Sequence, residues 1–103
     1  MKLRWTQYAS DQLDAVVDNL LERRGLDAAR LVTDQLLHRA RRLRELPWSA
    51  PKWVAGQDET FRRLVVDDFV ILYRVDKLEG VVFVLSVKHG RQRPLDADDV
   101  PKT

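Results

Sequence analysis

The chain has 103 residues, of which 45% are hydrophobic and 33% charged, a composition typical of one globular domain and not of a disordered chain. It has no cysteine, which excludes disulfides, thiolate chemistry and cysteine-based zinc sites. The net charge of +2 is too small to indicate a partner by itself. No apolar stretch approaches the roughly 20 residues that cross a bilayer, and residues 1–5 lack the apolar core of a signal peptide. We therefore expect a cytoplasmic protein without direct membrane contact.

The N-terminal half predicts a short strand at residues 3–5 and then two helices. Thr6 is a good N-cap for a first helix over about residues 7–24, which Gly25 would end. Asp27 is a candidate N-cap for the second helix, and Pro47 would end it. The connection between the two helices, from Gly25 to Asp27, is short, and so short a connection predicts an antiparallel helix hairpin.

The second helix carries one basic residue in an unexpected place. Arg39 falls inside the apolar stripe of this helix rather than opposite it. Its aliphatic stem can pack on apolar neighbours while its charge stays in water. Alternatively, Arg39 lines a groove where a partner docks.

The C-terminal half changes to the two-residue period of strands. Residues 47–59 read as a loop with Trp48 and Trp53, which either anchor it to the core or form a contact surface. Residues 60–66, 69–75 and 81–88 predict three antiparallel strands. The middle strand is apolar on both faces, so it should be central; the helices must cover one face, and what covers the other is left open.

Together these elements predict one α+β domain over residues 1–95, with the order β-α-α-β-β-β and a mainly antiparallel sheet. The short first strand should join this sheet at a position that the pattern leaves open. The remaining residues, 96–103, form an acidic tail that contains Asp96, Asp98 and Asp99.

Catalytic motifs are scarce. The only histidines are His38 and His89, neither in a metal-binding pattern, and no phosphate-binding glycine loop or serine triad is evident, so we expect no metal and no cofactor. Arg62, Arg74, His89 and Arg91 are the candidates for metal-independent RNA cleavage, which needs a base, an acid and cations for the phosphate. Strand alternation weakens this candidate site, because it separates Arg62 from Arg63 and Lys88 from His89.

Three sequence segments resemble the RelE/ParE toxin superfamily, and its ParE branch most. They lie at residues 61–66, 70–75 and 84–92, and the most specific parts are Tyr73-Arg74-Val75 and His89-Gly90-Arg91. Trp5-Thr6, Ala9 and Leu13 are also similar to the first helix of that family, so the resemblance covers residues 2–93. The loop departs from the family, which often has Pro, a short gap and Gly-Arg here: residues 47–53 contain no glycine, and Lys52 stands in place of the arginine.

The resemblance implies a toxin of a type II toxin–antitoxin module that a ParD-like antitoxin neutralises. ParE toxins inhibit DNA gyrase, whereas RelE toxins cut mRNA on the ribosome. RelE-type nucleases carry basic residues on the first meander strand and an arginine after an aromatic residue on the next. This chain has Leu64 and Val70 at those places. The resemblance therefore favours a non-enzymatic gyrase inhibitor that meets nucleic acid only through its antitoxin or target. The alternatives are a ribosome-dependent mRNA endonuclease and a non-toxic, antitoxin-binding paralogue.

Two surfaces follow from this interpretation. The residues expected to bind the antitoxin are Leu37, Arg39, Arg42, Trp48 and Trp53. The residues expected to bind the target are Arg62, Arg74, Lys88, His89, Arg91 and Arg93. An amphipathic antitoxin helix would lie along the helix hairpin, and an extended antitoxin segment would add to a sheet edge.

Overall fold

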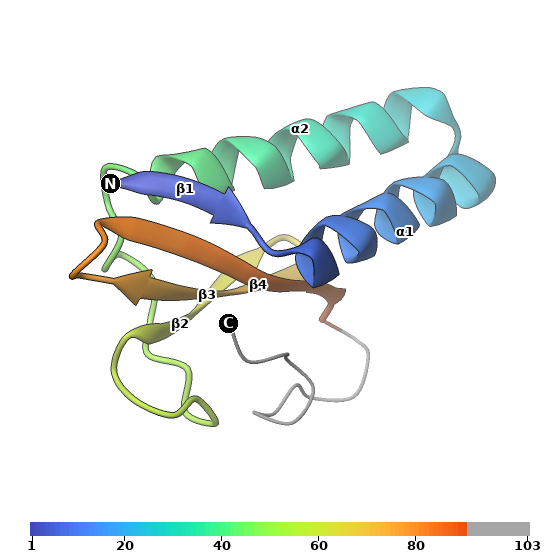
Figure 1. Ribbon diagram of the computed structural model, residues 1–103. Helices are drawn as coiled ribbons and strands as arrows, with labels where there is room; N and C mark the ends of the chain where they lie inside the picture. The colour runs from blue at the N-terminus through green and yellow to red at the C-terminus, as the bar shows by residue number, and fades with distance from the viewer. Residues whose placement is uncertain (91–103) are drawn as a thin grey trace.

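The predicted order of elements is confirmed in the structure, a computed structural model that describes residues 1–90 (Figure 1). The elements are β1 (Lys2–Trp5), α1 (Gln7–Arg24), α2 (Leu26–Arg42), β2 (Phe61–Val66), β3 (Phe69–Asp76) and β4 (Val81–His89). They form an α+β domain in which the two helices lie side by side over one four-stranded sheet of order β1-β4-β3-β2. β1 runs parallel to β4, and the other neighbours are antiparallel, which settles the place of the first strand. No helix within residues 1–90 is long and apolar enough to cross a membrane.

The helix boundaries follow local chemistry, with two corrections to the prediction. The Thr6 hydroxyl accepts a hydrogen bond from the Ala9 N–H at 3.1 Å, as expected of an N-cap. Gly25 alone joins the helices, and its φ of 88° suits a residue without a Cβ. The predicted cap at Asp27 is wrong, because α2 already begins at Leu26 and Asp27 lies in its first turn, where a carboxylate suits the helix dipole.

The predicted end of the second helix is also wrong. α2 ends at Arg42, and hydrogen-bonded turns occupy residues 43–45, so the helix stops before Pro47. Leu43 is still buried, whereas Leu46 is exposed. The burial of Leu36, Ala40 and Leu43 shows which face of α2 lies on the sheet.

The two faces of β3 belong to different apolar clusters. Its odd-numbered residues from Phe69 to Val75 pack under the helices in the main core. Val70 and Leu72 face the other way and pack with Leu85 and Trp53, with Phe83 beside them. β3 is therefore an inner strand buried on both faces, as predicted, and the loop before β2 supplies the cover that the sequence left open.

That loop is fixed to the outer edge of β2. The Trp53 N–H donates to the Phe61 carbonyl at 2.9 Å, the Arg63 N–H donates to the Pro51 carbonyl at 3.0 Å, and Lys52 forms a bridge with Arg62 between them. The buried Trp53 ring lies 6.3 Å from the Phe61 ring. Trp53 is thus an anchor for the loop, one of its two expected roles.

A β-bulge in β4 changes which side chains face the helices. Tyr73 pairs with Val84, but Leu72 pairs with Ser86, so Leu85 is the extra residue. Gln12 of α1 fills the irregularity: its Oε1 accepts from the Ser86 hydroxyl at 2.9 Å and from the Val87 N–H at 2.8 Å. The buried polar groups at the bulge are satisfied by the helix that covers them.

Candidate functional site

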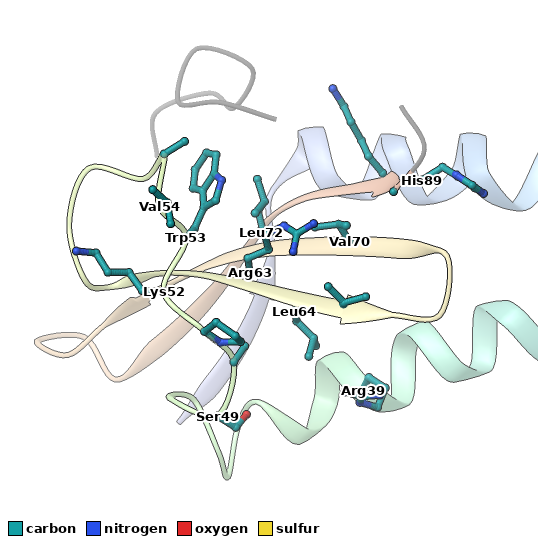
Figure 2. A pocket seen from close by; sticks show the side chains of 16 residues that line it. Arg39, Ser49, Lys52, Trp53, Val54, Arg63, Leu64, Val70, Leu72 and His89 are labelled. Atoms are coloured by element: carbon teal, nitrogen blue, oxygen red, sulfur yellow. The ribbon is translucent and has the colours of Figure 1, made fainter. Parts of the chain in front are cut away.

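A hollow of about 760 Å³ runs around the outer edge of β2 (Figure 2). On the helix side it meets Arg39 of α2 and Leu64. On the opposite side of the sheet its floor is formed by Val70 and Leu72, and Trp53 stands at one end. The hollow arises because residues 51–53 pair with only the first half of β2. Beyond Arg63 the loop no longer covers the edge, and Val65 is half exposed there.

The hollow is cationic around an apolar floor. Its basic side chains come from four separate segments: α2, the loop, β2 and the end of β4. They are Arg39, Lys52, Arg63 and Lys88. No carboxylate of residues 1–90 is among the residues that line it. This combination of positive charge and apolar surface suits a polypeptide that carries acidic and apolar side chains, or a polyanion.

Lys88 and His89, both expected to contact the target, lie at this hollow. They remain on opposite faces of β4, as strand alternation predicts, because Lys88 pairs with Val70 whereas the His89 ring packs edge-on against Phe69 at 5.2 Å. Arg91 and Arg93, which were expected to act with them, lie outside the described residues. The hollow therefore unites part of the predicted target set with Arg39 and Trp53 of the predicted antitoxin set.

Arg62 lies away from the hollow and binds groups of its own chain. Its guanidinium donates to the Glu59 carbonyl at 2.9 Å and to the Ala50 carbonyl at 3.2 Å. It also lies 4.9 Å from the centre of the Trp48 ring, and the Lys77 ammonium lies 5.6 Å from the same ring. Trp48 is 38% exposed, so this second tryptophan offers a cation-flanked aromatic surface separate from the hollow.

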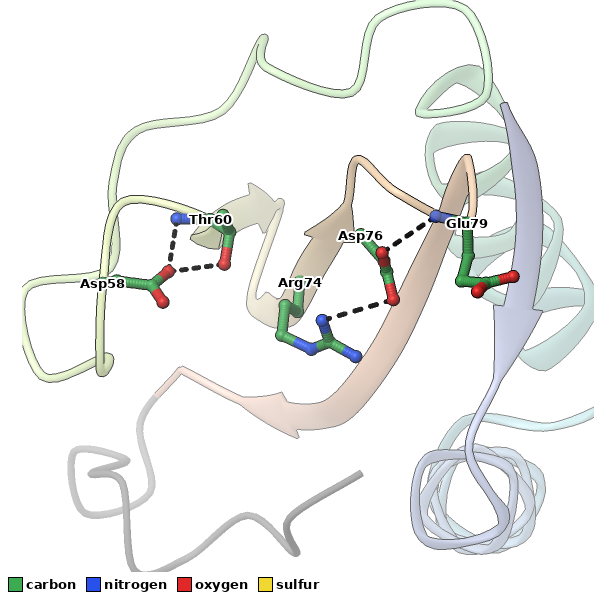
Figure 3. Close-up of polar contacts among 5 residues, drawn as sticks. All are labelled: Asp58, Thr60, Arg74, Asp76 and Glu79. Atoms are coloured by element: carbon green, nitrogen blue, oxygen red, sulfur yellow. Dashed lines mark hydrogen bonds and ion pairs between the residues drawn. The ribbon is translucent and has the colours of Figure 1, made fainter.

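Arg74 lies on the face of the sheet opposite Arg62, because Arg62 pairs with Tyr73, the neighbour of Arg74 on β3. Figure 3 shows the polar contacts around Arg74. Its guanidinium is 5.1 Å from the centre of the Phe83 ring and 3.8 Å from Asp76. Nearby, Asp58 accepts hydrogen bonds from the Thr60 hydroxyl at 2.5 Å and from the Thr60 N–H at 2.8 Å, and these bonds hold the pKa of Asp58 below its ordinary value. Asp58 thereby fixes the chain just before β2 begins.

The four residues weighed for RNA cleavage are not brought into one cluster. Arg62 and Arg74 are on opposite faces, His89 lies at the far end of β4, and Arg91 falls outside the described part of the chain. Within residues 1–90 no group of histidine, aspartate and glutamate side chains is arranged to hold a metal ion.

The residues expected to bind an antitoxin are also divided. Arg39 and Trp53 line the hollow, but Leu37 lies on the other flank of α2, in a groove beside β1. Arg42 is exposed near the end of α2. Sequence reasoning missed Arg63 as a lining residue. The signal for it was its spacing from Val65 on a strand, which places both on one face.

Comparison with known proteins identifies the family of the chain. A family model described as "ParE toxin of type II toxin-antitoxin system, parDE" matches residues 3–94. The chain belongs to the ParE toxin family. No curated protein sequence matches the chain.

Solved structures confirm the ParE/RelE-like fold of this family member. It is similar to a chain of the chromosomal ParDE toxin–antitoxin system from P. aeruginosa, with a TM-score of 0.72 and 21% identity over 86% of this chain and 95% of that one. It is also similar to a chain of the toxin–antitoxin complex RelBE2 from Mycobacterium tuberculosis, with a TM-score of 0.63 and 18% identity over 85% of this chain and 88% of that one. Since both identities are low, they establish the architecture and leave the role of each site to the local chemistry.

Proposed function

We propose that this ParE family member arrests growth by binding DNA gyrase, and that a ParD-like antitoxin neutralises it. The family match over residues 3–94 supports a toxin, because it assigns the chain to the toxins of type II modules, and the gyrase target is proposed from the placement of the basic residues. Antitoxin control is supported by the two similar structures, which are described as a toxin–antitoxin system and a toxin–antitoxin complex.

A binding mechanism is favoured over RNA cleavage by the placement of the basic residues. Cleavage needs a base, an acid and a cation around one phosphate. Here Arg62 is engaged with loop carbonyls on one face, while Arg74 lies on the other. The hollow instead offers Arg63 and Lys88 beside an apolar floor, the pattern of a surface that takes a protein. We therefore assign the target contact to this hollow, with Lys88 and His89 at its end.

The test is DNA supercoiling by purified gyrase in the presence of the purified chain. We expect inhibition, and we expect the double variant Arg63→Glu/Lys88→Glu to weaken it by about tenfold or more, because charge reversal in a contact surface replaces attraction with repulsion. Arg23→Glu/Arg30→Glu is the matched control: it makes the same change of net charge on exposed residues beside the turn between α1 and α2, neither of which lines the hollow.

Three outcomes would contradict the proposal in different ways. Unimpaired supercoiling at large excess of the chain would rule out gyrase. Cuts within translated codons, mapped in cellular mRNA after induction, would favour the endonuclease. Normal growth of a host without the antitoxin would indicate a non-toxic paralogue that serves only to bind an antitoxin.

A further inference from the structure

The loop between α2 and β2 forms one wall of the hollow, and its shape depends on the contacts that tie it to the sheet. Residues 47–59 contain no helix or strand apart from the bridge at Lys52. Residues 49–55 of this loop all line the hollow. A segment without a hydrogen-bonding ladder of its own takes its conformation from the groups around it. The contacts that hold this loop therefore determine the shape of the hollow.

The two halves of the loop are held in different ways. The second half is anchored by the buried Trp53 ring, which packs with Val70 and Leu72. In the first half, the N–H and the hydroxyl of Ser49 both donate to the Leu46 carbonyl, at 3.2 and 2.8 Å. These bonds close the turn but do not join it to the sheet. The hydrogen bonds that attach residues 47–50 to the sheet come from side chains of the strands.

Arg62 supplies part of this attachment and links the two ends of the loop. Its guanidinium donates to the Ala50 carbonyl at 3.2 Å and to the Glu59 carbonyl at 2.9 Å. The same group lies 4.9 Å from the centre of the Trp48 ring. Arginine suits this role because its planar guanidinium has five N–H donors and stacks on aromatic rings, whereas lysine carries a compact ammonium group.

Arg62 is separate from the hollow that its contacts shape. It is not among the residues that line the hollow, whereas its neighbour Arg63 is. Successive residues of a strand point to opposite faces, so Arg62 lies on the face of Tyr73, its partner on β3. The Tyr73 hydroxyl donates to the Pro47 carbonyl at 2.7 Å, so these two paired side chains hold the same turn. Arg62 can therefore influence a partner in the hollow through the loop.

We propose that Arg62 is a positioning residue for target binding. It joins the two ends of the loop over residues 47–59, and the loop then holds its wall of the hollow in the shape that the target meets. The inference rests on the proposed function for the identity of the target. It deepens that function by separating the residues that contact the target, such as Arg63 and Lys88, from one that acts on the target only through the loop.

Two variants remove the contacts of Arg62 in different ways, and hydrogen exchange measures the response of the loop. Arg62→Lys keeps the charge and loses the planar donor group, whereas Arg62→Met loses both. The Arg63 amide bonds to the Pro51 carbonyl, and it should exchange about tenfold or more faster in both variants than in the parent. Unchanged exchange in both variants would overturn the proposal, because the loop would then be held without Arg62.

Gln12→Leu is the matched control for stability. It removes hydrogen bonds at the bulge of β4 and destabilises the fold without changing a residue of the loop or of the hollow. In this variant the Arg63 amide should exchange within about twofold of the parent rate. Exchange as fast as in the Arg62 variants would show a general loss of stability in place of release of the loop, and would overturn the proposal.

Binding kinetics on immobilised gyrase measure the consequence for the target. Both Arg62 variants should dissociate about tenfold or more faster than the parent, whereas Gln12→Leu should stay within about twofold. The dissociation rate is the informative quantity, because partial unfolding lowers the concentration of active protein and leaves the release of bound, folded protein unchanged. Parental dissociation of Arg62→Lys beside fast dissociation of Arg62→Met would show that the charge matters and would overturn the positioning role.

The two measurements separate this inference from the proposed function. If the parent neither binds gyrase nor inhibits supercoiling, the gyrase target is rejected, and hydrogen exchange still decides whether Arg62 holds the loop. If the parent inhibits supercoiling, and the Arg62 variants release the loop but keep the parental dissociation rate, the positioning role is rejected and the gyrase target stands.

Discussion

Tyr73 connects the sheet to the loop that shapes the hollow, and removing its hydroxyl gives a quantitative test of that connection. The side chain is fully buried under the helices, and its hydroxyl donates to the Pro47 carbonyl at 2.7 Å. Tyr73→Phe keeps the ring and removes one hydrogen bond. We expect a loss of about 1 kcal/mol in the free energy of unfolding at neutral pH, which corresponds to about 4–8 °C in Tm for a domain of this size.

The pH dependence of this loss gives an independent check. Burial raises the pKa of Tyr73 above its ordinary value of 10.0. The folded state then holds the proton more tightly than the unfolded state, so the stabilisation is complete below about pH 10 and declines as the pH rises above the unfolded pKa. The Phe variant lacks this dependence, and the difference between the two proteins should shrink in alkaline solution.

Urea unfolding from pH 7 to 11 measures both effects. Tyr8→Phe, a change at a partly buried tyrosine of α1, is the matched control and should cost less than half as much as Tyr73→Phe. If the Tyr73→Phe protein were as stable as the parent at pH 7, or if the gap widened above pH 10, the proposed role of this hydrogen bond would be wrong.

Three further changes test other parts of the structure. Gln12→Leu removes the acceptor of two hydrogen bonds at the bulge and should cost roughly 2–4 kcal/mol in urea unfolding; a loss under about 0.5 kcal/mol would mean that water replaces the glutamine. Gly56→Ala would place a Cβ 2.5 Å from the Phe61 Cβ, so we expect the loop to shift at a cost of about 1–3 kcal/mol, and unchanged thermal unfolding would contradict this close approach. Asp58→Asn should flatten the acid limb of the stability curve, because the lowered pKa of Asp58 gives stability that is present above its ordinary value of 3.8 and lost as pH falls below it; identical acid titrations of the two proteins would show that the Thr60 contacts do not matter to folding.

The fold was largely predictable because its elements carry strong local signals. The helix from Gln7 to Arg24 has a capping threonine at one end and a glycine at the other, and both act where the pattern indicates. The three strands of the meander were found within a residue at each end, since Val, Phe and Ile alternate over long stretches. The end of α2 was missed because Leu43 and Leu46 continue the helical spacing, although only Leu43 is buried.

The site was less predictable because it depends on contacts between distant segments. The pairing of residues 51–53 with β2 leaves no periodic trace in the sequence, yet it creates the hollow and recruits Lys52 and Arg63 to it. The bulge at Leu85 changes which residues of β4 face the helices. The side chain that satisfies the polar groups of the bulge is Gln12, more than 70 residues earlier in the sequence. Arg62 and Arg74 were grouped in one candidate site because both are basic, whereas the pairing of β2 with β3 puts them on opposite faces of the sheet.

The C-terminal half of α2 stands as a ridge between two cationic surfaces. Its buried face, with Leu36 and Ala40, packs on the sheet. Arg39 lines the hollow, and Arg41 lines the groove beside β1. Arg39 and Arg41 belong to the same helix, so a partner that shifted this helix from the groove would also displace a side chain of the hollow. Neutralisation by displacement of one helix and neutralisation by competition for one surface then predict different binding equilibria: the first allows a ternary complex with the target, and the second forbids it.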